Sequence, residues 1–178
     1  GRSSSSISTK EEEDCKKIVS EFIDEFGGLD ILVNNAGIYI RKGIENGDIE
    51  VYDRTMDINV KGTYVMTKFS LPYLEESDHG RIINVSSQIS FQGSDHAAAY
   101  ATSKSAQVGL TRALATEFAP KGINVNAIAP GTIETDMHGI YSQEELQEKA
   151  ENVPLKRLGQ PEDIGDAAVY LASDMGSY

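Results

Sequence analysis

The segment Leu29-Asp30-Ile31-Leu32-Val33, followed by Asn34-Asn35-Ala36-Gly37, decides the fold class of this chain. Its first part is a short apolar run directly after Gly27-Gly28, and it predicts a strand buried on both faces. Its second part consists of residues that favour a turn. A strand of this kind belongs to a parallel sheet, in which ligands sit outside the carboxyl ends of the strands. The turn at 34–37 therefore marks a candidate binding site.

Segments with helix and strand patterns alternate on both sides of this stretch. Apolar residues at helical spacing predict helices over 10–26, 49–74 (in two pieces), 100–119, 142–152 and 161–172. Further apolar runs predict strands over 81–86 and 123–129, while 87–99 is expected to be a loop and 1–9 a flexible lead-in or junction. The alternation predicts an α/β fold, with a doubly wound parallel sheet and helices on both faces.

Composition limits the classes of protein to which the chain can belong. Its 178 residues suffice for a sizeable core, and we expect 1–178 to form a single domain. The formal net charge of −12 argues against nucleic acids and anionic membranes as partners, because phosphate binding needs clustered Lys and Arg. The sequence has no apolar run long enough to span a bilayer. Cys15 is the single cysteine, which excludes an internal disulfide and suits the cytoplasm.

A candidate catalytic group stands at the start of the predicted helix 100–119. Tyr100 and Lys104 are four residues apart, so on a helix they lie on one face, one turn apart. An ammonium beside a phenol favours the phenolate, and we expect it to lower the tyrosine pKa from about 10 towards the working range of a general acid or base. Ser87, upstream in the chain, could hold a substrate oxygen while that proton moves.

A set of features resembles the short-chain dehydrogenase/reductase family, in this order: Asn-Asn-Ala-Gly at 34–37, Asn59, Ser87, Tyr100-x-x-x-Lys104 and Pro130-Gly131. The match extends from Leu29 to Thr135, and the tail 155–178 is also similar to the family. Tyr-x-x-x-Lys alone is common by chance, whereas the whole set at these distances is very specific. The resemblance implies a Rossmann-like fold and an NAD- or NADP-dependent enzyme that interconverts an alcohol and a carbonyl by hydride transfer.

The resemblance also implies roles for individual residues. Tyr100 would be the acid or base, Ser87 would donate to the substrate oxygen, and Lys104 would lower the Tyr100 pKa and bind the nicotinamide ribose. Asn59 would hold a water that links Lys104 to solvent. His96 would contact the substrate, the alternative being a solvated pair with Asp95. Besides Tyr100 and Lys104, two turns would contact the cofactor, through Asn35, Ala36, Gly37, Pro130, Gly131, Ile133 and Thr135.

Alternatives stay open for several of these residues. Ser86 competes with Ser87 for the catalytic role, and the spacing to Tyr100 favours Ser87. Asn59 could be a buried structural amide, since only its spacing supports a role in the site. His79 and His138 show no metal-ligand pattern, so no metal is expected.

The chain departs from the family pattern near both ends. The Gly-rich turn of the family (Thr-Gly-x-x-x-Gly-x-Gly), which binds the cofactor pyrophosphate at a helix N-terminus, does not occur in the sequence. A final strand, expected after Tyr178, is also absent. We therefore expect these residues to be part of a longer dehydrogenase; the alternative is a truncated protein without cofactor binding.

The acidic segment 75–78 bears on the substrate class. Carrier-dependent relatives tend to have basic residues at this place, and an acidic acyl carrier protein would be repelled here. Lys121 is basic at the other usual contact with the carrier, but it stands alone. We therefore expect a small free alcohol, ketone or sugar as substrate; the alternatives are a 3-oxoacyl-acyl-carrier-protein reductase and a non-catalytic relative. Small residues on the helix 100–119 permit close helix packing and agree with the homodimer or homotetramer that the resemblance implies.

Overall fold

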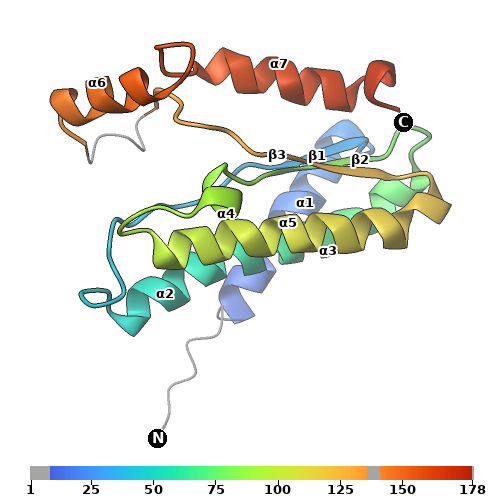
Figure 1. The fold of residues 1–178 in the computed structure, drawn as a ribbon. Coiled ribbons are helices and arrows are strands. Elements are labelled where there is room, and N and C mark those ends of the chain that lie inside the picture. Colours follow the sequence, from blue (N-terminus) through green and yellow to red (C-terminus); the bar gives the residue numbers. More distant parts are fainter. Residues whose placement is uncertain (1–8, 136–140, 178) are drawn as a thin grey trace, which may run out of the picture.

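The computed structural model describes residues 9–135 and 141–177, and of residues 9–11 only the backbone. Three parallel strands form a sheet in the order β1 (Ile31–Asn34), β2 (Arg81–Val85) and β3 (Asn124–Ile128) (Figure 1). Ile31 pairs with Arg81, which in turn pairs with Asn124, so the strands begin at the same level. This register places the carboxyl ends of all three strands along one edge of the sheet.

Helices cover both faces of the sheet, but unequally. α3 (Gly62–Glu76) and α5 (Ala98–Phe118) pack on one face, and α1 (Thr9–Phe26) packs against α3. α7 (Pro161–Ala172) lies on the opposite face, where it contacts β2 and β3 (Figure 1). The prediction of an α/β fold with a parallel sheet between helices is confirmed.

The hydrophobic core lies between the sheet and the helices α3 and α5. Its buried members come from these elements or from their ends: Leu32, Leu74, Ile82, Leu114, Phe118, Ile123 and Val125. Burying a side chain of this size contributes about 1.5–3 kcal/mol. This layer therefore fixes α5, and with it the residues at the start of that helix, against the ends of the strands.

β1 is buried on one face only, so the prediction of a strand buried on both faces is wrong. Leu32 is 8% exposed, whereas Ile31 and Val33 are 40% and 44% exposed. Alternate side chains of a strand point to opposite faces, and the helix on the outer face, α7, packs against β2 and β3. β2 has the predicted character instead, since every residue from Arg81 to Asn84 is buried.

The middle of the chain is more regular than predicted. The two expected helical pieces are α2 (Ile49–Met56) and α3, and the π-helical turn η1 (Asp57–Lys61) joins them without a break. The predicted loop 87–99 contains the short helix α4 (Ile89–Gln92), and α5 starts at Ala98, before the predicted start at Tyr100. The 3-10 turn η2 (Ala119–Lys121) then ends α5, and Gly122 supplies the left-handed conformation (φ 75°) that this stop requires.

The remaining elements are α6 (Gln143–Asn152) and the 3-10 turn η4 (Asp174–Gly176). Of the predicted lead-in over 1–9, only Thr9 is described, as the first residue of α1; the other residues of the lead-in, and His138, lie outside the described residues. Within 9–135 and 141–177, no helix combines the length and the hydropathy needed to cross a membrane. The same residues contain no group of three or more His, Cys, Asp or Glu side chains placed to hold a metal ion.

Candidate active site

The polar turns after the three strands meet at the carboxyl edge of the sheet. Residues 35–37 follow β1, 86–88 follow β2, and 129–131 follow β3. A backbone hydrogen bond joins two of these turns, because the Gln88 amide donates to the Pro130 carbonyl at 2.9 Å. The predicted cofactor residues Asn35 and Ala36 are exposed at this edge, where a ligand can reach them.

Tyr100 lies in the first turn of α5 and is 8% exposed. Burial raises the pKa of Tyr100 above its ordinary value, and a hydrogen-bonding interaction with the Ser87 hydroxyl acts in the opposite direction. The loop after β2 holds Ser87 from both sides. Its carbonyl accepts a bond from the Ser90 hydroxyl (2.6 Å), and its Oγ accepts one from the Ile89 amide (3.3 Å). The structure thus brings the predicted phenol and hydroxyl together.

The Lys104 ammonium is buried next to this pair. Its Nζ lies 5.7 Å from the centre of the Tyr100 ring and donates to the Val85 carbonyl (2.7 Å) and to Gln107 Oε1 (2.9 Å). Burial lowers the pKa of Lys104 from 10.5 to about 8. The predicted lowering of the Tyr100 pKa is not seen here, because burial of the phenol dominates and the ammonium bonds to Val85 and Gln107.

Asn59 ties the turn after β1 to this centre. It lies in the π-helical turn η1 and is fully buried. Its side chain accepts from the Ile38 amide (2.8 Å) and donates to the Ile38 carbonyl (2.9 Å) and to Ser103 Oγ on α5 (3.0 Å). A Cβ on Gly37 would lie 3.1 Å from Asn59 Oδ1 and 3.5 Å from Lys104 Nζ. Glycine therefore lets the backbone approach both groups closely.

Sequence reasoning missed a buried polar network behind these residues. Asn34 donates to Asn84 Oδ1 (2.9 Å), and Asn84 donates to Thr111 Oγ1 (2.9 Å), which links β1, β2 and α5. Ser86 has a structural role of the same kind, since its hydroxyl donates to the Lys104 carbonyl (2.9 Å). An asparagine within an apolar strand was the available signal, because a buried amide needs partners.

An aromatic cluster that the sequence did not suggest lies against Tyr100. The ring of Tyr39 packs 4.8 Å from the ring of Tyr100, and the Tyr141 hydroxyl donates to the Tyr39 hydroxyl at 3.3 Å. Burial is the largest cause that raises the pKa of Tyr39, and this hydrogen bond raises it further. Arg41 Nη1 binds Glu145 Oε1 at 2.8 Å, and Arg41 Cζ lies 5.0 Å from the centre of the Tyr141 ring. These contacts attach the start of α6 to the segment after β1.

His96 lies in the turn before α5, where it is half exposed and has a left-handed backbone (φ 53°). Its Nε2 lies 3.1 Å from Asp95 Oδ2. This is the pair with Asp95 that was the predicted alternative, and contact of His96 with a substrate stays a prediction.

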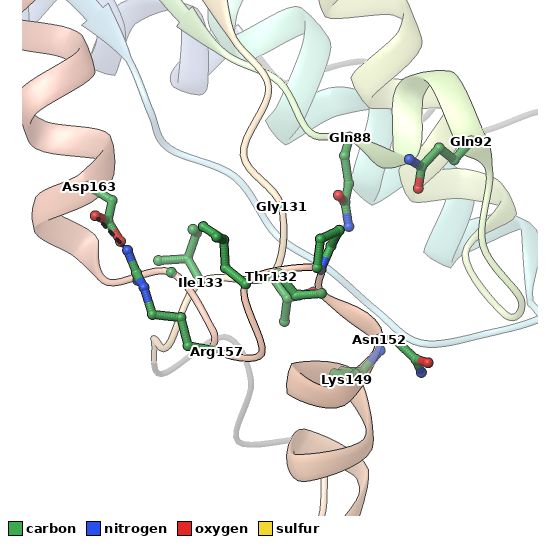
Figure 2. Close-up of a pocket in the computed structure, with 13 residues that line it drawn as sticks. Gln88, Gln92, Gly131, Thr132, Ile133, Lys149, Asn152, Arg157 and Asp163 are labelled. Atoms are coloured by element: carbon green, nitrogen blue, oxygen red, sulfur yellow. Dashed lines mark hydrogen bonds and ion pairs between the residues drawn. The ribbon is translucent and has the colours of Figure 1, made fainter.

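A cleft of about 580 Å³ opens between the turn after β3 and α6 (Figure 2). Two predicted cofactor residues, Gly131 and Ile133, line it, and Gln88, the neighbour of Ser87, lies beside Gly131. Amides and cations make up most of its polar lining: Gln88, Gln92, Asn152, Lys149 and Arg157. Arg157 forms an ion pair at the wall of the cleft, where its Nη1 lies 2.9 Å from Asp163 Oδ2 (Figure 2). Thr135 is exposed and is not among the lining residues.

Comparison with known proteins gives consistent matches over nearly the whole chain. A family model described as enoyl-(acyl carrier protein) reductase matches residues 6–178. The 3-oxoacyl-[acyl-carrier-protein] reductase FabG of Aquifex aeolicus is 38% identical over 167 residues, which are 94% of this chain and 67% of that protein. The 3alpha-hydroxysteroid dehydrogenase of Mediterraneibacter gnavus is 37% identical over 171 residues, 96% of this chain and 68% of that protein.

A solved structure has the same fold. The short-chain dehydrogenase/reductase SDR:glucose/ribitol dehydrogenase from Brucella melitensis superposes with a TM-score of 0.88 at 36% sequence identity. The match covers 93% of this chain and 66% of that one. The chain thus spans about two thirds of the length of the relatives that it matches.

Proposed function

Because the chain belongs to the short-chain dehydrogenase/reductase family, we propose that the whole protein is an NAD- or NADP-dependent oxidoreductase that interconverts an alcohol and a carbonyl. The observation that carries this proposal is the meeting of Tyr100, Ser87 and Lys104 at the carboxyl edge of the sheet. A phenol, a hydroxyl and a buried ammonium are the groups that a proton transfer to a carbonyl oxygen needs.

The edge of the sheet fits the nicotinamide half of such a cofactor. Gly37 keeps the backbone open beside Lys104, and Gly131 does the same in the cleft, where a Cβ would lie 3.2 Å from Gln88 Oε1. When bound, the nicotinamide supplies or accepts the hydride. Lys104 and the turn 130–133 would hold it there, while the turn 35–37 would line the adenosine and ribose side of the cofactor. The predicted contact of Thr135 with the cofactor is part of the same proposal.

Side chains of the protein would transfer the proton and stabilise the substrate oxygen. In carbonyl reduction, the Tyr100 hydroxyl gives its proton to the substrate oxygen while Ser87 Oγ donates a hydrogen bond to that oxygen. The phenolate that forms is favoured by the nearby Lys104 charge. Since burial raises the pKa of Tyr100, the phenol is protonated near neutral pH and is ready to act as the acid in this direction.

Within this activity we propose a small free alcohol, ketone or sugar as the substrate. The amide-rich lining of the cleft suits a ligand with several hydroxyl groups, because amides both donate and accept hydrogen bonds. The acidic segment 75–78 disfavours an acidic carrier protein. Lys121, the basic residue at the other expected carrier contact, is paired with Glu75 at 2.5 Å. This pair removes the positive charge that a carrier would need.

A 3-oxoacyl-acyl-carrier-protein reductase is the second candidate. The name of the Aquifex aeolicus relative favours it. The discriminating experiment is a steady-state assay of the whole protein with NADH and NADPH, on small ketones, on sugars and on a 3-oxoacyl-carrier thioester. We expect a higher kcat/KM for the free carbonyl compounds. Turnover of the thioester alone would overturn the substrate proposal, and absence of turnover with all of them would favour a non-catalytic relative.

We also propose that the protein forms a homodimer or homotetramer through α3 and α5. An apolar depression of about 290 Å³ lies between η1, α3 and α5, and it is lined by Met56, Asp57, Val60, Lys61, Tyr64 and Leu110. Gly109 on α5 faces open space, which permits close approach of a second helix. The single cysteine of the sequence agrees with the cytoplasmic location that we propose.

A further inference from the structure

Gln107 lies one helical turn after Lys104 on α5 and is fully buried. Its side-chain amide makes three hydrogen bonds. Oε1 accepts from Lys104 Nζ (2.9 Å), while Nε2 donates to the Asn59 carbonyl (2.7 Å) and to Thr63 Oγ1 (3.0 Å). The orientation of the amide follows from these neighbours, because the reverse orientation would place its NH₂ group against an ammonium and its oxygen against a carbonyl.

The Asn59 carbonyl that Gln107 contacts lies in η1. In the regular turns of an α-helix, a carbonyl accepts the amide of the next turn. Within the π-helical turn, the Asn59 carbonyl accepts from the Thr63 hydroxyl (3.0 Å) and from Gln107 Nε2 (2.7 Å). The resemblance assigned to Asn59 a water that connects Lys104 to solvent. That water stays a prediction; Gln107 on α5 connects the Asn59 carbonyl and Lys104 directly.

The bridge also fixes the direction of the remaining ammonium donor. A lysine ammonium has three donors in tetrahedral arrangement. The Val85 carbonyl takes one and Gln107 Oε1 takes another. With two donor directions set by buried groups of β2 and α5, the third direction is determined by geometry. A cation that is 4% exposed also needs such partners to stay buried.

We propose that Gln107 is a positioning residue, which bridges Lys104 to the Asn59 carbonyl and thereby sets the orientation and the charge of the catalytic ammonium. The inference rests on the proposed function of Lys104. The titratable groups on this side of Lys104 are Tyr100 on the same helix and, beyond it, Tyr39 and Tyr141. From β2 and η1, the groups described around the ammonium and its bridge are the backbone carbonyls of Val85 and Asn59.

The test is a titration of Lys104 in the whole protein, free of cofactor, by NMR of its 13Cε and 15Nζ nuclei. Lys104→Met identifies the signal. Gln107→Leu removes the acceptor that stabilises the charged form, and we expect the pKa of Lys104 to fall. Gln107→Glu places a carboxylate against the ammonium, and we expect a rise of about 1–3 units. General loss of stability cannot produce shifts in opposite directions.

Thr111→Val is the matched control, because Thr111 lies one turn further along α5 and bonds to Asn84 and to the Gln107 carbonyl, away from the ammonium. It should lower the melting temperature and leave the Lys104 titration unchanged. If Gln107→Leu does not fold, the expected rise of the Lys104 pKa in Gln107→Glu is sufficient to test the role of Gln107. Unchanged titrations, or shifts in the same direction, would overturn the inference. A wild type that titrates as expected but lacks turnover would instead count against the proposed function.

Discussion

At the scale of single residues, the site combines two groups whose ordinary ionisation is changed by burial. Tyr100 keeps its proton more firmly than a free phenol, and Lys104 loses its proton more readily than a free amine. The hydrogen bond with Ser87 lowers the pKa of Tyr100 and so opposes part of the rise that burial causes. The proton chemistry of the proposed reaction therefore depends on few side chains, and each can be tested by substitution.

Removing the phenolic hydroxyl should abolish most of the proposed activity. Tyr100→Phe keeps the ring that packs against Tyr39 but has no proton to transfer. We expect kcat to fall by about 10²–10⁴-fold, the range for loss of a general acid or base. Tyr170→Phe, on an exposed position of α7, is the control and should retain wild-type kinetics. Hydride transfer at an unchanged rate in Tyr100→Phe would show that the assigned mechanism is wrong.

Ser87 should act on the transition state rather than on binding. Ser87→Ala removes the donor proposed for the substrate oxygen, and loss of one such donor typically lowers kcat by about 10²–10³-fold. KM should change much less. Ser86→Ala serves as the neighbouring comparison, because the Ser86 hydroxyl bonds to the Lys104 carbonyl and contributes to structure. A larger loss of kcat in Ser86→Ala than in Ser87→Ala would exchange the roles assigned to the two serines.

Burial of Lys104 should make stability depend on pH. The folded-state pKa is about 8 and the ordinary value is 10.5, so between these values the unfolded chain binds more protons. The free energy of unfolding should therefore rise with pH in this window, by roughly 2 kcal/mol between pH 8 and 10 from Lys104. Urea denaturation of the wild type and of Lys104→Met at both pH values isolates this contribution. Equal pH dependence in both proteins would contradict it.

The residues that the sequence predicted and those that it missed differ in a physical way. Tyr100, Lys104 and Ser87 could be found because their residue types and spacing belong to one chemical reaction. Gln107 and Asn84 were missed, because most of their bonds reach partners that are distant in the chain. For Gln107 a weak signal existed, since a residue one turn after Lys104 lies on the same helix face.

At the scale of elements, α6 has no buried residue, and local interactions determine its start. Ser142 Oγ accepts from the Glu145 amide (3.2 Å), and Glu145 Oε2 accepts from the Ser142 amide (2.9 Å), which is a capping box. Glu145 also binds Arg41 through its other oxygen. One carboxylate thus starts the helix and attaches it to the segment after β1.

Substitutions at 142 and 145 should separate these two functions of α6. Ser142→Ala removes the cap and should destabilise the helix by about 1 kcal/mol, seen as faster amide hydrogen exchange over 143–152. Glu145→Gln keeps a capping residue but removes the charge that pairs with Arg41. It should leave exchange over 143–152 nearly unchanged and raise KM. Faster exchange in Glu145→Gln, at the level of Ser142→Ala, would contradict this separation.

Element types were predictable, whereas burial and boundaries were not. Periodicity gave the helices and strands because it reflects which faces meet a core. The exposure of Ile31 and Val33 depends on where α7 packs, and no pattern within β1 contains that information. The start of α5 at Ala98 depends in the same way on the turn before it, where His96 has a left-handed backbone.

At the scale of the whole molecule, the apolar side chains of the sheet differ in what they contribute. Leu32 faces the core formed with α3 and α5, whereas Val33 faces outward at 44% exposure. Leu32→Ala should lower the free energy of unfolding by about 2–5 kcal/mol, the range for large-to-small core substitutions. Val33→Ala should lower it by much less. Urea denaturation of both variants of these 178 residues tests the difference; equal losses would show that the outer face of β1 is covered.

The proposed assembly depends on the depression between η1, α3 and α5. Tyr64 lies at its rim and is 56% exposed. Tyr64→Arg would place a charge in an apolar contact and should shift the whole protein towards the monomer, measured by light scattering after size-exclusion chromatography. Ile18→Arg, at an equally exposed position on α1, is the control and should leave the molar mass unchanged. An unchanged mass in both variants would place the interface elsewhere.

The π-helical turn η1 has a consequence for the gene as well as for the protein. Such turns commonly occur as single insertions within an α-helix at functional sites. Deleting one codon within 57–61 would convert α2, η1 and α3 into one continuous regular helix. The helix would survive and its two flanks would keep their register, because a turn of this kind absorbs the extra residue, but the side chains within 57–61 would change position. Asn59 could then no longer contact Ile38 and Gln107 together, so selection for activity should reject a deletion that selection for folding alone would accept.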